Sequence, residues 1–412
     1  MIYHKRTTCR ACGGQRLRRF LSLGPQPLAN SFLRSRDEFA GELRHPLDVY
    51  FCEGCSLVQI LDVIDPEVLF RHYLYVTGTS ETIAAHNREY ARAVVETLAL
   101  GSGDLVVEIA SNDGSLLKCF QPYGVKTLGV EPATNITEIA VASGVETVNK
   151  FFDSVTAEEV RQSYGPARVV IGNNVLAHVD DTLDFLRGCA NLLAEDGLVI
   201  IEVPYLRDLL DLAAYDTVYH EHHCYFSATS LKRLCEAAGL LAVRIDRLPV
   251  HGGTLRMYAG LRNRHEHRAD EIEAMIEEER RAGMSDFARY EKLAAGVVAN
   301  RRDILRLLEG LKREGKTVAG YGAPAKGNTL LNYCGITTDL LPYTVDKSHL
   351  KIGLYTPGTH IPVLPASTLI ERQPDYSLIL AWNFAEEIMR QQREYRERGG
   401  RFIIPIPIPK VV

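Results

Sequence analysis

Four of the nine cysteines form two close pairs in the first 55 residues, Cys9-x-x-Cys12 and Cys52-x-x-Cys55. A tight turn presents both thiolates of such a pair to one metal ion, and a structural zinc ion binds sulfur at about 2.3 Å. The other five cysteines stand singly, and an odd total disfavours a disulfide framework. The two pairs therefore predict a structural zinc site, because four thiolates leave no open position on the ion for catalysis.

A second group of reactive side chains lies within the eight residues Tyr219-His220-Glu221-His222-His223-Cys224-Tyr225-Phe226. Three histidines and a carboxylate are more titratable groups than a loop needs, and a neutral imidazole is an available base near pH 7. The stretch therefore indicates acid–base catalysis. The alternatives are histidines that only pack in the core, and a second metal site through His220 and His222.

Acidic residues follow two predicted strands. The short apolar runs 105–110 and 127–132 are typical of buried parallel strands, and they place Glu108 and Glu131 near strand ends. The turn Glu108-x-Ala110-x-Asn112-x-Gly114 is similar to motif I of class I S-adenosylmethionine-dependent methyltransferases, although Ala110 and Asn112 replace two of its glycines. Such a turn lets a ligand approach the backbone, and a carboxylate after the next strand accepts hydrogen bonds from ribose hydroxyls. The alternative is an α/β domain whose strand ends are acidic without a ligand.

The repeated pattern of strand and helix indicates the fold that positions these residues. Further strands are predicted at 167–172, 197–203 and 241–246, with helical patterns between them. Such alternation is typical of a doubly wound parallel sheet, which binds ligands at the carboxyl ends of its strands. Asn173 and His178 follow the strand that borders the methyl-transfer centre in this fold. The N/D-P-P-Y/F motif of base-modifying enzymes is absent there.

The C-terminal third has an α/β pattern of its own. Residues 266–315 have helical spacing, and 317–322 is a predicted strand that leads into a glycine turn, with Lys326 at the start of a helix. Backbone N–H groups and a lysine at a helix N-terminus suit a pyrophosphate; the alternative is a structural Rossmann copy. We therefore predict an α/β protein of three domains: a zinc-binding domain 1–75, a methyltransferase domain 76–255 with a doubly wound sheet, and a Rossmann-type domain 256–412.

Composition limits the classes of protein. The 412 residues include 47 Lys+Arg against 52 Asp+Glu, a net charge of −5. A mild acidic excess lacks the electrostatic signature of a nucleic-acid binder. The sequence has no run of about 18 apolar residues that would span a membrane, and its N-terminus does not resemble a signal peptide. We therefore expect a cytoplasmic protein with neither a nucleic-acid nor a membrane partner. Three domains with an internal cleft need no second subunit to complete a site, so we expect a monomer that binds a small molecule.

Taken together, these motifs resemble those of the sugar C-methyltransferases that act on nucleotide-linked 4-keto deoxysugars, the family of the tetronitrose C-3-methyltransferase of antibiotic deoxysugar pathways. The resemblance covers essentially the whole chain. It includes the cysteine pairs, the turn 108–114, the stretches 173–178 and 219–226, and Gly320-Tyr321-Gly322-Ala323-Pro324-Ala325-Lys326-Gly327-Asn328. It implies S-adenosylmethionine as methyl donor and a structural zinc. It also implies methylation at C-3 of a sugar linked to thymidine diphosphate (dTDP), bound between the last two domains.

The resemblance also implies roles for individual residues. His222 is the expected base that removes the C-3 proton to form an enolate, with Glu221 and Tyr219 orienting it or binding sugar hydroxyls. His178 is expected near the ketone or the base, and Tyr73, or alternatively Tyr75, over the site. The methyl donor is expected at Glu108, Ala110, Asn112, Asp113, Gly114, Glu131 and Asn173, and the sugar nucleotide at Tyr321, Ala323, Lys326, Asn328, Lys351 and Asn383.

Two other classes stay open at this point. An O- or N-methyltransferase would use the same donor site without an enolate. A non-catalytic binding module would use the zinc domain as a contact surface and would not bind S-adenosylmethionine.

Overall fold

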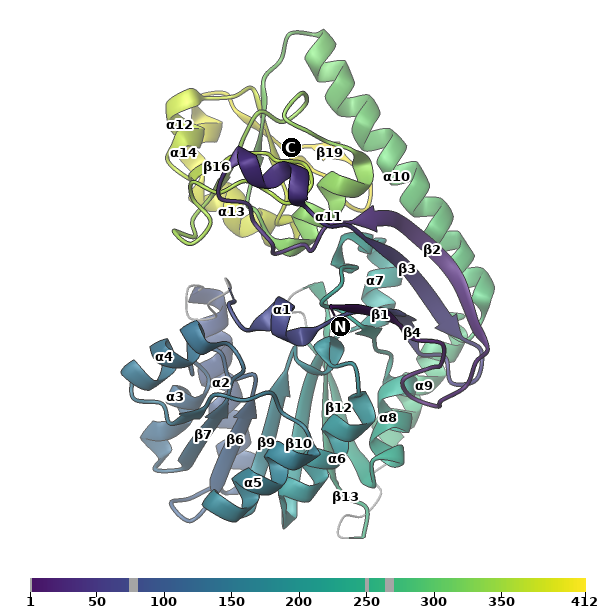
Figure 1. Cartoon of the computed structure of the whole chain (residues 1–412), viewed down its shortest axis with the longest axis vertical. Coiled ribbons are helices and arrows are strands. Elements are labelled where there is room, and N and C mark those ends of the chain that lie inside the picture. Colours follow the sequence, from purple (N-terminus) through teal and green to yellow (C-terminus); the bar gives the residue numbers. More distant parts are fainter. Residues whose placement is uncertain (1, 74–80, 249–251, 264–269) are drawn as a thin grey trace.

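The computed structural model describes residues 2–73, 81–248, 252–263 and 270–412 of the chain, so Tyr75 lies outside the described residues. The three largest sheets have seven, six and four strands. The seven-stranded central sheet and the six-stranded C-terminal sheet lie in separate halves of the molecule (Figure 1). Within the described ranges, no helix has the length and apolar character needed to cross a membrane. The α/β fold class is as predicted.

The central sheet has seven strands in the order β12-β13-β10-β9-β6-β7-β8. The strands from β10 to β8 run parallel, as expected, while β13 runs antiparallel to both of its neighbours. Their bounds are β6 (Leu105–Ile109), β7 (Lys126–Val130), β8 (Thr147–Val148), β9 (Ala167–Asn173), β10 (Leu193–Pro204), β12 (Leu240–Leu248) and β13 (Thr254–Leu261). Sequence reasoning missed β13 because the buried Arg256, which pairs with Glu202, interrupts its apolar run.

Helices cover both faces of this sheet (Figure 1). They are α2 (Glu81–Leu98), α3 (Leu117–Phe120), α4 (Thr134–Ala142), α5 (Ser154–Tyr164), α6 (Thr182–Leu192) and α8 (Ala228–Ala237), with α7 (Leu206–Leu212) after β10. All five residues of β6 are buried, as a parallel strand between two helical layers requires. The polar ends of β6, β7, β9 and β10 therefore meet at one edge of the sheet.

The C-terminal sheet has six strands in the order β16-β15-β14-β17-β18-β19, all parallel except β19. The strands are β14 (Val318–Tyr321), β15 (Thr344–Asp346), β16 (Val363–Pro365), β17 (Tyr376–Ile379), β18 (Arg401–Ile404) and β19 (Lys410–Val411). Their helices are α11 (Ala325–Cys334), α12 (Thr368–Arg372), α13 (Ala385–Gln391) and α14 (Arg393–Glu397). The chain order reverses direction between β14 and β17, which is where doubly wound sheets bind ligands.

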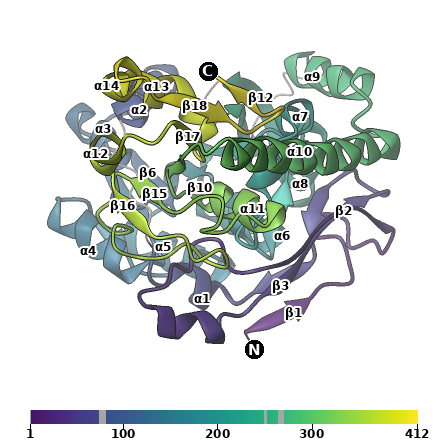
Figure 2. The same ribbon diagram turned by 90° about the horizontal axis from the view of Figure 1, so that it is seen from above.

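The N-terminal residues connect the two halves. Strands β2 (Leu17–Gln26), β3 (His45–Cys52) and β4 (Val58–Ile60) form an antiparallel sheet that ends in β11 (Cys224–Tyr225), a strand from the middle of the chain. The long helix α10 (Phe287–Arg313), preceded by α9 (Asp270–Arg281), runs beside β2 (Figure 1; Figure 2 shows the same helix from above). Tyr290 of α10 packs on Phe20 and Phe51, with ring centroids 5.1 and 4.7 Å apart. A small sheet of β1 (Tyr3–Lys5) and β5 (Asp62–Ile64), then α1 (Pro66–Phe70), completes this part.

Candidate active site and metal centre

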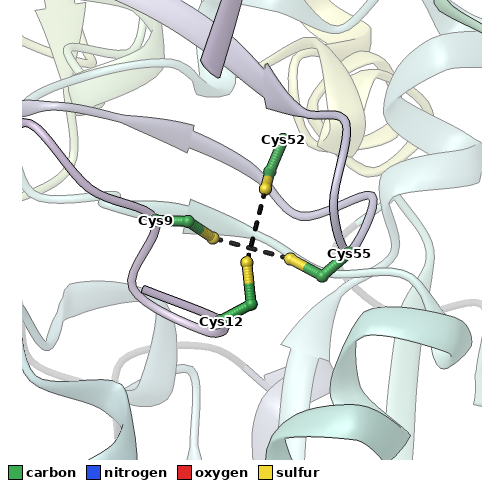
Figure 3. Close-up of side chains that lie close together, drawn as sticks. All are labelled: Cys9, Cys12, Cys52 and Cys55. Carbon is green, nitrogen blue, oxygen red and sulfur yellow. Dashed lines mark hydrogen bonds between the residues drawn. The ribbon is translucent and has the colours of Figure 1, made fainter. Parts of the chain in front are cut away.

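The four predicted metal ligands lie together beside the start of β2 and the end of β3 (Figure 3). Their sulfur atoms are all within 4.8 Å of one another. The pairs Cys9–Cys55 and Cys12–Cys52 have Sγ–Sγ distances of 3.5 and 3.6 Å. Tetrahedral zinc–sulfur bonds of about 2.3 Å place the sulfur atoms about 3.8 Å apart. The cluster therefore fits a closed four-thiolate zinc site.

A hydrogen-bonded path leads from this cluster toward the centre of the molecule. The side chain of Gln59 donates to Cys9 Sγ at 3.1 Å, and its oxygen accepts from the Arg10 side chain at 3.2 Å. Arg10 in turn donates to the carboxylate of Asp180 at 3.1 Å. Asp180 lines the central cavity, so partners of the metal ligands reach the wall of the candidate active site.

One cavity of about 720 Å³ lies where the three sheets meet. The central sheet contributes residues from the ends of β6, β7, β9 and β10, and the C-terminal sheet contributes the turn after β14. Predicted site residues on its wall are Tyr73, Glu108, Ala110, Asn112, Asp113, Glu131, Asn173, His178, Tyr219, His222, Lys326, Lys351 and Asn383. Residues from both predicted ligand sites and the histidine cluster therefore share one cavity.

The turn after β6 has the backbone conformation of a glycine-rich turn, although alanine and asparagine occupy two of its positions. Ala110 and Asn112 adopt left-handed φ angles of +54° and +50°. The Glu131 carboxylate stabilises the turn, because it accepts hydrogen bonds from the backbone N–H of Asn112 at 2.9 Å and of Ala133 at 2.8 Å. Gly114 cannot be replaced so easily, since a Cβ there would lie 2.7 Å from Val145.

Glu108 is a buried carboxylate whose Oε2 has no hydrogen-bond partner in the described structure. Burial, together with the neighbouring charges of Asp113 and Glu131, raises the pKa of Glu108 well above its ordinary value. A buried carboxyl oxygen without a partner is costly unless a ligand group pairs with it. The cavity wall beside Glu108 therefore suits a ligand with a cationic or hydrogen-bond-donating group.

His222 has a defined tautomer. Its Nδ1 lies 2.9 Å from the carbonyl oxygen of Thr217, which can only accept, so Nδ1 has the proton. Its Nε2 then accepts a hydrogen bond from the Tyr219 hydroxyl at 2.8 Å. The His178 ring lies edge-on at 4.7 Å between centroids. Burial, and then the neighbouring His178, hold the pKa of His222 well below its ordinary value, so the ring is neutral near pH 7.

Glu221 lies behind the cavity wall rather than on it, being 2% exposed and absent from the lining residues. It accepts hydrogen bonds from Asn30 Nδ2 at 2.7 Å and from the Tyr73 hydroxyl at 3.3 Å. Burial raises the pKa of Glu221 to about 7, although these two hydrogen bonds and the charge of Lys351 oppose the shift. The geometry therefore places Tyr73 and Asn30 between Glu221 and any ligand in the cavity.

The C-terminal wall is formed by the turn after β14 and by residues after β15 and β17. Lys326 lies at the start of α11, with Nζ 5.4 Å from the centre of the Trp382 ring. Lys351 Nζ donates to the backbone oxygen of Ala323 at 2.9 Å. The Trp382 indole donates to the buried Asp216 at 2.6 Å, which joins this wall to the segment before His222.

Three of the predicted substrate residues lie off the cavity wall. The Tyr321 hydroxyl is buried and accepts from Gln392 at 3.0 Å. Asn328 donates to the backbone oxygen of Ala29 at 2.7 Å, and Ala323 N–H donates to Asp346 at 2.7 Å. These contacts turn the Tyr321 and Asn328 side chains toward the protein interior, so the three residues support the C-terminal wall from behind.

Comparison with known proteins decides the family. Family models match in chain order: "Putative zinc binding domain" at residues 9–70, "Methyltransferase domain" at residues 83–245 and "C-methyltransferase C-terminal domain" at residues 249–407. The chain is 40% identical over 404 residues to the C-methyltransferase NovU of Streptomyces niveus, which covers 98% of this chain and 96% of that protein. The chain belongs to the C-methyltransferase family.

Solved methyltransferase structures resemble part of this C-methyltransferase. Magnesium protoporphyrin IX methyltransferase of Synechocystis PCC 6803, with bound S-adenosylmethionine, is 14% identical and covers 46% of this chain and 88% of its own, with a TM-score of 0.34. The 1,6-didemethyltoxoflavin-N1-methyltransferase of Burkholderia thailandensis is 21% identical and covers 43% of this chain and 79% of its own, with a TM-score of 0.33.

Both predicted cofactors suit this C-methyltransferase. S-adenosylmethionine is the methyl donor that its methyltransferase domain implies. The donor has an ammonium group and ribose hydroxyls, which suit the unpartnered Glu108 oxygen and the Glu131 carboxylate at adjacent strand ends. The zinc-binding domain has its four cysteines in a cluster that matches zinc.

Sequence reasoning missed several residues of the cavity wall in this C-methyltransferase. Asp346 is an acidic residue at the end of strand β15, as Glu131 is after β7, so the same sequence pattern predicts it as a ligand-binding residue. Trp382 lies in a short 3-10 helix after β17, and an indole there is as typical of core packing as of a ligand site. Asn30 has no local signal at all, because it reaches the cavity from the N-terminal domain.

Proposed function

We propose that this C-methyltransferase transfers a methyl group to C-3 of a dTDP-linked 4-keto-6-deoxy sugar, through an enolate, in deoxysugar biosynthesis. One observation supports it above all: His222 lies in the same cavity as the turn after β6 and as Lys326, which follows the turn after β14. A small O- or N-methyl acceptor would not need the second α/β domain. The similarity to sugar C-methyltransferases points to the same substrate class.

Methylation at carbon needs a carbanion. S-adenosylmethionine, when bound, supplies an electrophilic methyl group, and a saturated sugar carbon has no lone pair to attack it. A ketone at C-4 makes the neighbouring C–H bond acidic, because its oxygen takes up the negative charge after proton removal. The protein must therefore provide a base near that proton and stabilise the developing oxyanion.

The histidine cluster provides these groups in the proposed mechanism. His222 Nε2 is unprotonated and takes the C-3 proton, while Nδ1–H stays bound to the Thr217 carbonyl. Without a ligand, the Tyr219 hydroxyl donates to His222 Nε2. When the sugar occupies the cavity, this hydroxyl rotates and donates to the ketone oxygen instead. His178, which stays neutral because burial lowers its pKa to about 4, lies beside this oxygen. Tyr73 covers the sugar from the N-terminal side.

The C-terminal wall binds the nucleotide in this proposal. The N-terminus of α11 offers backbone N–H groups to the diphosphate, and Lys326 and Lys351 add positive charge. Asn383 lies on the same wall. We propose that the enzyme acts as a monomer, since one chain supplies every wall. The predicted division at residues 75 and 255 stays a prediction; β13 continues past residue 255 within the central sheet.

Mass spectrometry and NMR test the proposal. The enzyme is incubated in deuterated water with S-adenosylmethionine and dTDP-4-keto-6-deoxyglucose. One added methyl group at C-3, located by NMR, is the expected result. A methyl group on oxygen or at C-5, the other carbon next to the ketone, would contradict the C-3 enolate mechanism. No methyl transfer, with donor binding intact, would contradict the substrate class.

A further inference from the structure

Residues 27–44, which connect β2 to β3, cross to the C-terminal half of the molecule; we call them the strap (Figure 1). Leu33 and Tyr355 exchange backbone hydrogen bonds of 3.0 and 2.8 Å. The Phe39 ring stacks on His360 at 3.8 Å between centroids. The buried Asn328 donates to the Ala29 carbonyl at 2.7 Å. The strap is therefore fixed on the C-terminal domain on both sides of Asn30.

Asn30 is partly exposed on the cavity wall. Its amide is oriented by Glu221, because an ionised carboxylate only accepts hydrogen bonds and so must face the NH₂ group, at 2.7 Å. The carbonyl oxygen Oδ1 then points away from Glu221. In the parts of the chain that the structure describes, no side chain donates to this oxygen, and it is accessible rather than buried. A free acceptor therefore faces the cavity.

We propose that Asn30 is a specificity residue, whose Oδ1 accepts a hydrogen bond from a hydroxyl or amino substituent of the acceptor sugar, while Glu221 holds the amide in place. This inference rests on the proposed function, since it needs a sugar in the cavity. Glu221 is then a positioning residue that orients Asn30 and Tyr73 together. The strap makes the N-terminal domain part of the acceptor site as well as the support of the metal site.

The experiment compares binding of dTDP alone with binding of dTDP-4-keto-6-deoxyglucose by calorimetry. It uses the zinc-loaded full chain with S-adenosylhomocysteine, at about pH 8, where Glu221 is ionised because its pKa is about 7. Asn30→Ala is expected to bind dTDP like the wild type and the sugar nucleotide about tenfold more weakly, the effect of one lost hydrogen bond. Ser31→Ala, an exposed neighbour on the strap, is the control and should change neither affinity.

Asn30→Asp guards against a folding artefact. It keeps the size of the side chain and an acceptor oxygen for the sugar, and the raised pKa of the adjacent Glu221 lets the two carboxyl groups share a proton. Asn30→Asp should therefore bind the sugar nucleotide more tightly than Asn30→Ala, with zinc content and melting temperature checked for each variant. Wild-type affinity for the sugar nucleotide in Asn30→Ala would overturn the inference and leave the proposed function standing. A wild-type enzyme that binds dTDP and its sugar conjugate equally well would contradict the proposed function, and the inference with it.

Discussion

Gln59 of β4 lies opposite Cys224 of β11 in an antiparallel pair, and Cys224 follows His222 by two residues. The backbone N–H of Ile60 donates to the carbonyl of His223 at 3.0 Å, and the Gln59 side chain donates to Cys9 Sγ at 3.1 Å. The sheet that supports the metal ligands therefore also holds the histidine segment. We therefore expect zinc binding to keep the proposed base in position, although a zinc ion with four thiolate ligands has no open position for chemistry.

Loss of zinc should therefore loosen the histidine segment before the central sheet. Cys12→Ser is expected to lower zinc content and to speed amide hydrogen exchange in 219–226 by about tenfold or more, because β11 loses its ordered partner strand. Exchange in β6 and β9 should hardly change. Cys119→Ser, outside the cluster, is the control. Unchanged amide exchange in residues 219–226 after zinc loss would show that the metal does not stabilise the histidine segment.

The proposed base can be tested directly. His222→Asn should lower turnover by roughly two to four orders of magnitude, the usual contribution of a general base. Affinity for S-adenosylmethionine should stay the same, because the donor residues lie on other strands. Steady-state kinetics and calorimetry measure the two effects. The exposed His349→Asn is the control, and a loss of only a few-fold in His222→Asn would move the base to His178 or Tyr219.

The pH dependence of turnover should show a base with a depressed pKa. His222 acts in its neutral form, and burial, His178 and Lys326 disfavour its protonation, so turnover should fall only well below an ordinary histidine pKa of about 6.5. Lys326→Met removes a positive charge, which raises the pKa of His222 and moves the acidic fall of kcat to higher pH. Lys347→Met, an exposed lysine, is the control. A fall of kcat that stays in place in Lys326→Met would contradict the assigned electrostatic coupling.

The turn after β6 should gain stability from a glycine. Ala110 has a left-handed φ of +54°, which costs an L-residue roughly 1–2 kcal/mol, part of which is offset by the greater chain entropy of glycine. We expect Ala110→Gly to raise the free energy of unfolding by about 0.5–1 kcal/mol, measured in denaturant. Ala295→Gly, on the exposed face of α10, should instead lower it by about 1 kcal/mol. Destabilisation by both variants would mean that Ala110 is not strained.

Much of the protein follows from local sequence. The cysteine spacing identified the zinc ligands because two thiolates in one turn need no long-range information. The apolar runs before Glu108 and Glu131 located the donor edge, since parallel strands end together. In the same way, the glycine turn before Lys326 located the wall of the second α/β domain.

The sequence by itself thus determined the fold class, the zinc ligands and thirteen of the residues that line the cavity. Only the tertiary structure decided which side chains face it: Glu221 lies behind the wall, and Asn328 anchors the strap instead of a substrate. Asn30 and Glu221 are 191 residues apart in the sequence, yet their side chains form a hydrogen bond at the site. No local pattern records such a contact, because it depends on how distant elements pack against one another.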